Sequence, residues 1–128
     1  MENFLYKFSL PFPPSMNMAY PTRRVKTRKG IIVERRVKSV RYKKWLKTAP
    51  DLPTMDIKPP IKIHYDIYFP DNRIRDGQNY LKIPLDYMVS KKLLPDDDRR
   101  YVVGESWDDC GNDKENPRIV IYILPIGK

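Results

Sequence analysis

The chain has 128 residues, enough to form one core without disulfide bonds, and a formal net charge of +9. Its single cysteine, Cys110, excludes an intrachain disulfide and a cysteine-based zinc cluster, and no run of 18 apolar residues is present to span a membrane. We therefore predict a single domain over residues 1–128 that is cytoplasmic, with no membrane partner and no small-molecule cofactor.

The charges are unevenly distributed along the chain. Twelve of the 25 Lys and Arg residues lie between Arg23 and Lys47, with one acid, Glu34, among them. Eight of the 16 acids lie between Asp96 and Glu115. A basic half of this kind indicates a nucleic-acid partner, although a solvated surface explains the charge alone equally well.

The first predicted element is a strand over residues 4–10, where aromatic and apolar residues alternate with polar ones. Prolines at 11, 13 and 14 end it, because proline has no N–H to donate to a ladder. Residues 15–20 follow as a loop. Its Asn17 can bond a phosphate or fix a turn, and the chemistry alone favours the turn.

A basic hairpin is predicted over about residues 22–37, with its turn at Lys29–Gly30. Glycine supplies the positive φ that such a turn needs. Two short strands with so few apolar residues are weakly held by a core, so we interpret them as a flap that meets phosphates. The alternative is an ordinary exposed hairpin.

Ser39 is a predicted N-cap for a helix over residues 40–48. We expect Val40 and Trp45 to face the core and the lysines to face solvent. A connector rich in proline follows. Residues 61–69 then alternate as the best strand of the chain. The only histidine, His64, lies on the polar face of that strand without a partner motif, so we interpret it as incidental.

The candidate site is the acidic loop and helix of about residues 70–98. It contains Asp76 next to arginines, then Lys82, and then a helical pattern that leads to three consecutive acids. Carboxylates and phosphate oxygens repel each other, so acids among basic residues indicate a divalent cation, naturally Mg²⁺, between them. Pro84 conflicts with a continuous helix, which we predict to be kinked there or split in two.

Two further strands are predicted, over residues 101–107 and 117–125, joined by a polar hairpin loop. With the preceding elements they give an α+β fold, a mixed sheet of about five or six strands with two main helices packed on it. There is no glycine-rich phosphate loop and no Ser/His/Asp constellation in the sequence.

The chain resembles the RusA family of Holliday-junction resolvases, which are common in bacteriophages and prophages. Nearly the whole chain takes part in the resemblance, which rests on Leu10–Ser15 followed by Asn17, on Arg75–Asp76 followed by Asn79 and Lys82, and on Asp96–Asp97. It implies an endonuclease that cuts branched DNA by paired nicks with Mg²⁺, for which Mn²⁺ can substitute. It also implies a homodimer in the cytoplasm of a bacterial or phage-infected cell.

The resemblance also implies roles for individual residues. Asp76 and Asp97 would hold the metal together with Asp96, and Lys82 would contact the scissile phosphate. Gln78 completes the catalytic set as a weak ligand. The DNA-binding set consists of Arg73, Arg75, Asn79, Lys82, Asn17, Arg23, Arg24, Lys26 and Arg28.

The chain departs from the family pattern at Gln78, where the family has a second aspartate. A neutral amide oxygen binds a cation more weakly than a carboxylate does and cannot act as a base. Asp71, Asp96 or Asp98 are candidates to replace the missing charge. Three functions therefore stay open: an active junction endonuclease, a catalytically impaired junction-binding protein, and a small basic RNA-binding protein.

Overall fold

The computed structural model describes residues 3–52 and 55–126. The fold is α+β, as predicted, and among these residues no helix is long and apolar enough to cross a membrane. Its elements, in chain order, are β1 (Tyr6–Pro11), α1 (Met16–Ala19), β2 (Thr22–Lys26), β3 (Ile32–Arg36), α2 (Val40–Thr48), β4 (Ile61–Phe69), the 3₁₀ helix η1 (Gly77–Tyr80), α3 (Lys82–Ser90), β5 (Val102–Asn112) and β6 (Arg118–Pro125).

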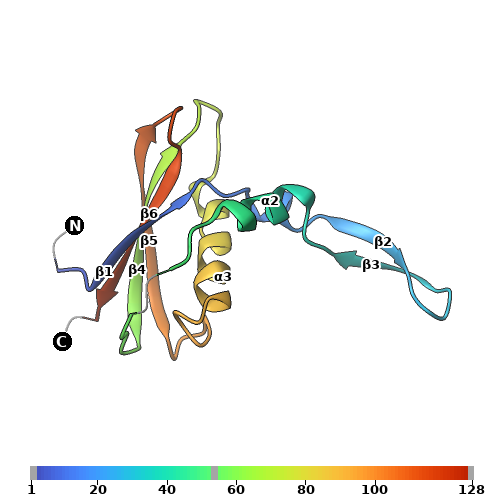
Figure 1. Cartoon of the computed structure of the whole chain (residues 1–128), viewed down its shortest axis with the longest axis horizontal. Helices are drawn as coiled ribbons and strands as arrows, with labels where there is room; N and C mark the ends of the chain where they lie inside the picture. The colour runs from blue at the N-terminus through green and yellow to red at the C-terminus, as the bar shows by residue number, and fades with distance from the viewer. Residues whose placement is uncertain (1–2, 53–54, 127–128) are drawn as a thin grey trace.

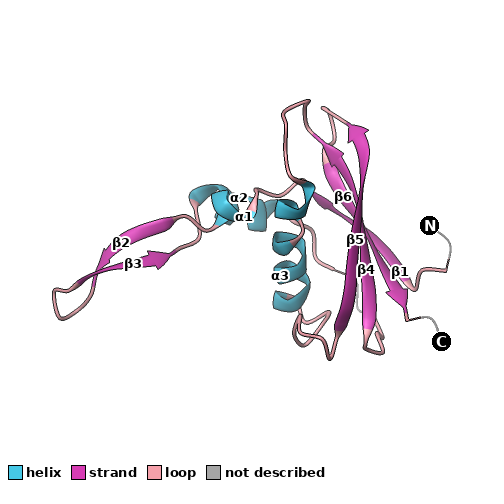
Figure 2. Ribbon diagram, turned by 180° about the vertical axis from the view of Figure 1, so that it is seen from behind, coloured by secondary structure: helices cyan, strands magenta, loops and turns pink. Residues whose placement is uncertain are grey.

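Four strands form a mixed sheet in the order β1-β6-β4-β5, in which β5 is parallel to β4 and the other pairs are antiparallel. The remaining strands, β2 and β3, pair with each other in a separate hairpin. The helices formed by the described residues all lie on one side of the sheet (Figures 1 and 2). The six strands therefore divide into a sheet of four and a hairpin of two.

The helix-facing side of the sheet forms the core. On β4, the alternate residues Ile61, Ile63, Tyr65 and Ile67 are fully buried, as the period of two in the sequence predicts. Isoleucines of β6 at positions 119, 121 and 123 lie beside them in the antiparallel register. Burial of each such side chain stabilises the fold by roughly 1.5–3 kcal/mol.

The helical pattern after β4 is split into two pieces, which confirms one of the two forms predicted from Pro84. The 3₁₀ helix η1 ends at Tyr80, and α3 begins at Lys82. Pro84 is then the third residue of α3, in the first turn, where a backbone N–H has no partner within the helix. The proline therefore removes no hydrogen bond from α3, and it fixes where the helix starts.

The helix α2 is capped as predicted, because the Ser39 hydroxyl accepts a hydrogen bond of 3.1 Å from the Tyr42 N–H. Trp45 is buried, and its indole N–H donates to the Pro11 carbonyl at 2.8 Å. The prediction that Val40 faces inward is wrong, since its side chain is 63% exposed. Val40 is two residues before the buried Tyr42, about 200° away around the helix axis.

The prediction of a hairpin between the last two strands is also wrong. β5 extends to Asn112 and pairs with β4, whereas β6 lies between β1 and β4. The chain therefore crosses the end of β4 between β5 and β6. The physical reason is that β6 is largely buried and takes a central position, while the mostly exposed β5 occupies an edge.

The β2–β3 hairpin projects away from the sheet and helices as an arm (Figures 1 and 2). Its turn contains Gly30 at φ 80°, as predicted. At its base, the Arg36 side chain donates to the Tyr20 carbonyl at 3.1 Å, and the Val37 N–H donates to the Pro21 carbonyl. Most of its residues are exposed, so it presents surface and little core.

Candidate functional site

Asp76 lies at the junction between the loop after β4 and η1. It is the N-cap of η1, and its Oδ1 atom accepts a hydrogen bond of 3.1 Å from the Gln78 N–H. Aspartate is favoured at this position because its carboxylate satisfies a backbone donor that the helix leaves free. The cap places Asp76 and Gln78, two of the predicted catalytic residues, in one tight turn.

Lys82 and Asp97, also predicted for the site, are in direct contact. The Lys82 Nζ atom is 2.6 Å from Asp97 Oδ2 and 3.1 Å from Asp86 Oδ1. The hydrogen bond from Lys82 lowers the pKa of Asp97. Burial lowers the pKa of Lys82, but the hydrogen bonds that its ammonium donates to Asp97 and Asp86 outweigh this effect and raise the pKa above its usual value. Lys82 and Asp97 are therefore both charged at neutral pH.

A cavity of about 340 Å³ lies next to these residues, between η1, α3 and β5. Gln78 and Lys82 line it from the helical side, and Glu105 and Trp107 line it from β5. No sequence pattern marks Glu105 as a site residue. The Tyr65 hydroxyl donates a hydrogen bond to its carboxylate, and burial, together with the charge of Glu105, raises the pKa of Tyr65 well above its usual value.

Gly77 fixes the distance between η1 and β5. A Cβ atom at this position would lie 2.5 Å from the nearest ring carbons of Trp107, closer than real Cβ contacts come. Glycine therefore lets the Trp107 ring pack directly against the turn that holds Asp76. This contact forms the wall of the cavity that Trp107 and Gln78 line.

The acids considered as substitutes for the missing aspartate are engaged elsewhere. Asp71 pairs with Arg75, and the hydrogen bonds of Arg75 lower its pKa. Asp98 pairs with Arg100 at 2.7 Å, which lowers its pKa to about 2. Asp96, predicted as a metal ligand, accepts the Asp97 N–H at 2.7 Å.

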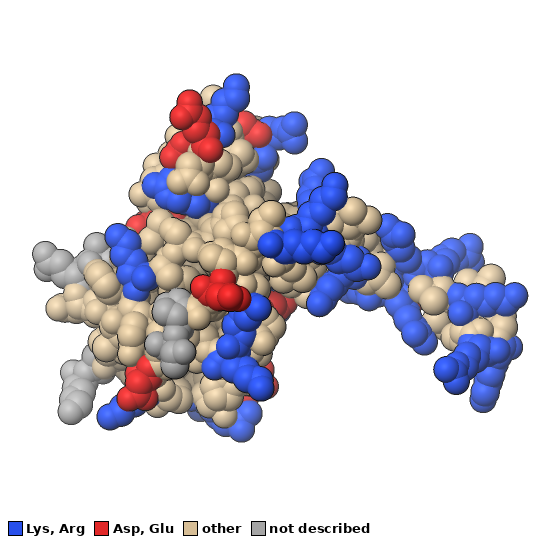
Figure 3. Space-filling model, in the orientation of Figure 1, with Lys and Arg blue, Asp and Glu red and all other residues tan. Residues whose placement is uncertain are grey.

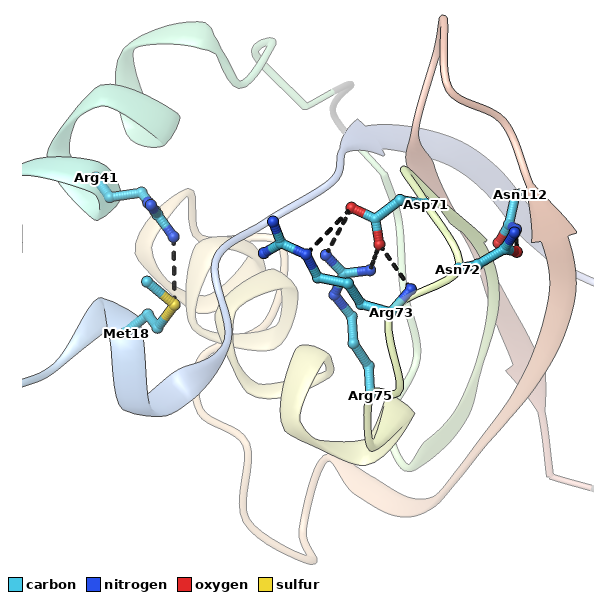
Figure 4. A network of polar contacts seen from close by, with 7 residues as sticks. All are labelled: Met18, Arg41, Asp71, Asn72, Arg73, Arg75 and Asn112. Carbon is cyan, nitrogen blue, oxygen red and sulfur yellow. Dashed lines mark hydrogen bonds and ion pairs between the residues drawn. The ribbon is translucent and has the colours of Figure 1, made fainter.

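The loop between β4 and η1 is organised by Asp71 (Figure 4). Its carboxylate receives two hydrogen bonds from Arg75, at 2.5 and 3.3 Å, and one at 2.9 Å from the Arg73 N–H. The Asn112 amide donates to the Asn72 side chain and ties the loop to the end of β5. The Arg75 side chain is 14% exposed and that of Arg73 is 81% exposed. Of the two predicted DNA-binding arginines, Arg75 thus shapes the loop and Arg73 extends into solvent.

A second cavity, of about 500 Å³, lies between this loop and the proline-rich segment after β1, and residues of both segments line it. Pro13 and Pro14 line one side, and Arg73 and Arg41 contribute positive charge. The Arg41 side chain also donates to the Met18 sulfur at 3.2 Å (Figure 4). The fold therefore brings together two of the three sequence motifs on which the family resemblance rests.

The sequence model of the family described as Endodeoxyribonuclease RusA matches residues 11–124 of the chain. The chain belongs to this family. The match covers nearly the whole RusA-like fold, from the end of β1 to β6, and it includes Asp76, Lys82 and Asp97. A comparison with curated proteins finds no match.

The other predicted DNA-binding residues of this RusA-family chain lie on two surfaces. Asn17 on α1 and Asn79 on η1 are exposed next to the motifs described above. On the arm, the only acid, Glu34, lies opposite Arg24 in the β2–β3 register. Lys and Arg side chains are spread along the arm (Figure 3), and the predicted ones are all exposed: Arg23, Arg24, Lys26 and Arg28.

The sequence interprets His64 as incidental, on a polar face without a partner motif, but in the structure the side chain has polar partners. His64 is 4% exposed, and its ring nitrogens contact Ser106, Asp66 and Asp108. Among the described residues, one group of three or more His, Cys, Asp and Glu side chains has ligand atoms close enough to hold a metal ion: His64, Asp66 and Asp108. The sequence signal for this group was the alternation of β4, which places His64 and Asp66 on the same face.

Proposed function

We propose that this protein is a Mg²⁺-dependent endonuclease that resolves four-way DNA junctions by paired nicks. The observation that carries the proposal is the RusA family match over residues 11–124. Two contacts support it. Lys82 forms an ion pair with Asp97, and a single turn on the same side of the sheet holds Asp76 and Gln78.

The side chains that we propose as ligands suit a hard cation. Asp76, Asp97 and Gln78 offer oxygen atoms, the ligands that Mg²⁺ and Mn²⁺ take in proteins. When bound, such an ion supplies charge neutralisation at the phosphate and an activated water molecule. Asp97 is held charged by Lys82, so it can bind a cation without first losing a proton.

We propose Glu105 as the acid that compensates for Gln78. Both residues line the same cavity, and Lys82 lines it with them. The phenol of Tyr65 stays protonated and donates to the Glu105 carboxylate, which holds that carboxylate toward the cavity. Asp71 and Asp98 are less suited to the role, because each is already paired with an arginine.

Lys82 and the basic surfaces would bind the DNA. The charged ammonium of Lys82 is placed to contact the scissile phosphate and to stabilise the extra negative charge of the transition state. Arg73 and the arm would contact the phosphate backbone elsewhere, positioning the junction without reading its sequence. Binding through such contacts weakens strongly as salt is added.

Two symmetric nicks require two equivalent sites, and each chain offers one candidate site. We therefore propose a homodimer, in which a twofold axis places the two sites across the junction. Sedimentation of the purified protein at micromolar concentration tests this directly. A species of one chain at all concentrations would contradict it.

A second candidate function is favoured by Gln78. If Glu105 does not replace the missing carboxylate, the protein binds junctions and leaves them uncut. The two functions share the fold and the basic surfaces, and they differ in the chemistry alone.

The deciding experiment is incubation of the protein with a labelled synthetic four-way junction, with and without Mg²⁺ or Mn²⁺. Paired nicks that require the metal and that Asp76→Asn abolishes, with junction binding retained, are the expected result. A retarded but uncut junction supports the impaired protein. Equal binding to linear RNA and branched DNA would overturn both functions in favour of an RNA-binding protein.

A further inference from the structure

One face of the four-stranded sheet lies opposite the described helices (Figure 2). A cluster of polar side chains lies on this face: His64, Asp66, Ser106 and Asp108. His64 and Asp66 of β4 are on this face, since Tyr65 between them is buried in the core. In the parallel register, Ser106 lies opposite His64 and Asp108 lies opposite Asp66. The cluster therefore joins β4 to the edge strand β5.

Two carboxylates converge on one nitrogen of the His64 ring. The Nε2 atom is 2.9 Å from Asp66 Oδ1 and 3.2 Å from Asp108 Oδ2, and the three ligand atoms lie within 4.8 Å of one another. A neutral imidazole nitrogen carries one hydrogen or one lone pair, so it cannot satisfy both carboxylates. Ligand atoms around a tetrahedral ion with bonds of about 2.0–2.1 Å are about 3.3 Å apart, close to the spacings found here.

The second ring nitrogen is held by Ser106. Nδ1 is 2.6 Å from the Ser106 hydroxyl oxygen. When Nδ1–H donates to that hydroxyl, Nε2 presents its lone pair toward Asp66 and Asp108. This is the tautomer that a metal ion requires, and a hydrogen bond to the far nitrogen is how metal-binding histidines are oriented.

We propose that His64, Asp66 and Asp108 bind one divalent transition-metal ion, zinc, at a site separate from the candidate catalytic acids. An imidazole nitrogen favours zinc over Mg²⁺, which prefers oxygen ligands alone. The Asp108 side chain is 72% exposed, which leaves room for water as a fourth ligand on the solvent side. The ion would fasten the edge strand β5 to β4.

The site is separate because neighbouring residues of each strand point to opposite faces. Tyr65 points into the core and reaches Glu105 in the cavity next to Lys82. His64 and Asp66 point away from that cavity. The proposal therefore does not depend on nuclease activity, and it is tested without DNA.

The experiment is a zinc titration of the full chain, free of any polyhistidine tag and first stripped with a chelator. His64 is the only histidine in the sequence, so a single set of imidazole NMR signals reports on it. We expect binding of one zinc ion per chain, with a shift of these signals that millimolar Mg²⁺ does not prevent. Zinc is also expected to raise the melting temperature of the apo protein.

Three variants locate the ion. Asp108→Asn should weaken zinc binding at least about tenfold, and Ser106→Ala should weaken it by about 10–100-fold through the orientation of the ring. Both side chains are on an exposed strand, so the fold should persist, which circular dichroism checks. Asp109→Asn is the matched control, because Asp109 lies next along β5 and points to the other face.

Two results would overturn the proposal. His64 signals that do not respond to zinc would show that the cluster is a hydrogen-bonded network that binds no zinc ion. Zinc binding that Asp76→Asn removes and Asp108→Asn leaves intact would assign the ion to the candidate catalytic acids.

Discussion

The Nζ atom of Lys82 lies 2.6 Å from Oδ2 of Asp97. This contact joins the first residue of α3 to the three consecutive acids Asp96–Asp98, fifteen residues later at Asp97. The same ammonium group is 3.1 Å from Asp86. One cation thus holds two carboxylates together at the proposed catalytic site. Its removal affects the protonation of the site as well as its stability.

Lys82→Met is expected to raise the pKa of Asp97 toward its ordinary value, because the hydrogen bond from Lys82 is the largest cause of the lowered pKa. The lowered pKa of Asp97 contributes stability above pH 3.8, which is lost as pH falls through the folded-state value. The raised pKa of Lys82 contributes stability below pH 10.5, which is lost as pH rises through its folded-state value. NMR titration of the Asp97 carboxyl and urea unfolding across this range measure both effects.

The loss of stability in Lys82→Met should be about 0.5–1 kcal/mol between pH 5 and pH 10, because the pair is partly exposed and screened by water. The matched control is Lys91→Met, which removes a 3.7 Å pair with the exposed Asp51. We expect the control to change stability by a few tenths of a kcal/mol or less. Equal losses of stability in the two variants would show that the Lys82 ion pairs stabilise the fold no more than the exposed pair of Lys91 does.

Gly77→Ala should destabilise the protein by about 1–3 kcal/mol, since the new methyl group must displace the Trp107 ring. Gly104→Ala is the control, because its Cβ would be 3.5 Å from the Lys62 side chain, an ordinary contact, and should change stability by about 0.5 kcal/mol or less. Urea unfolding and tryptophan fluorescence measure the two effects. A Gly77→Ala protein as stable as the wild type would mean that the Trp107 ring can shift to admit the methyl group without a loss of packing.

Local sequence patterns predict much of the fold. The alternation of apolar and polar residues identifies β4, and a serine N-cap identifies the start of α2. Pro84 correctly indicates that the helical segment after β4 is interrupted. These features depend on residues within a few positions of one another. Periodicity and capping can therefore be recognised without knowledge of the partner elements.

The parts that the sequence does not predict depend on pairing between distant strands. The parallel pairing of β5 with β4 decides that Glu105 lines the same cavity as Gln78 and that Asp108 lies next to His64. A one-residue change of register would exchange these two acids between the faces of the sheet. No local pattern in β5 specifies that register, so both acids were missed.

Gln78→Asp and Glu105→Gln test which residue supplies the second carboxylate. Gln78→Asp adds a charged ligand and should tighten Mg²⁺ binding and raise the cleavage rate at low Mg²⁺. If Glu105 compensates for Gln78, Glu105→Gln should reduce cleavage at least about tenfold, and Gln78→Asp should restore it in the double variant. Junction cleavage as a function of Mg²⁺ concentration measures both. Unchanged cleavage in Glu105→Gln would remove this residue from the site.

A variant of the β2–β3 arm that lacks basic side chains tests whether the positive charge of the arm binds DNA. Each phosphate contact adds about 0.9 to the slope of log affinity against log salt, so a variant without four basic side chains should show a slope shallower by up to about 3–4. The variant changes four exposed residues to glutamine: Arg23, Arg24, Lys26 and Arg28. Its matched control removes four charges elsewhere: Lys58, Lys91, Lys92 and Lys114. Because the arm contributes little to the core, unfolding free energy should be unchanged, and equal slopes in the two variants would show that the arm acts only through net charge.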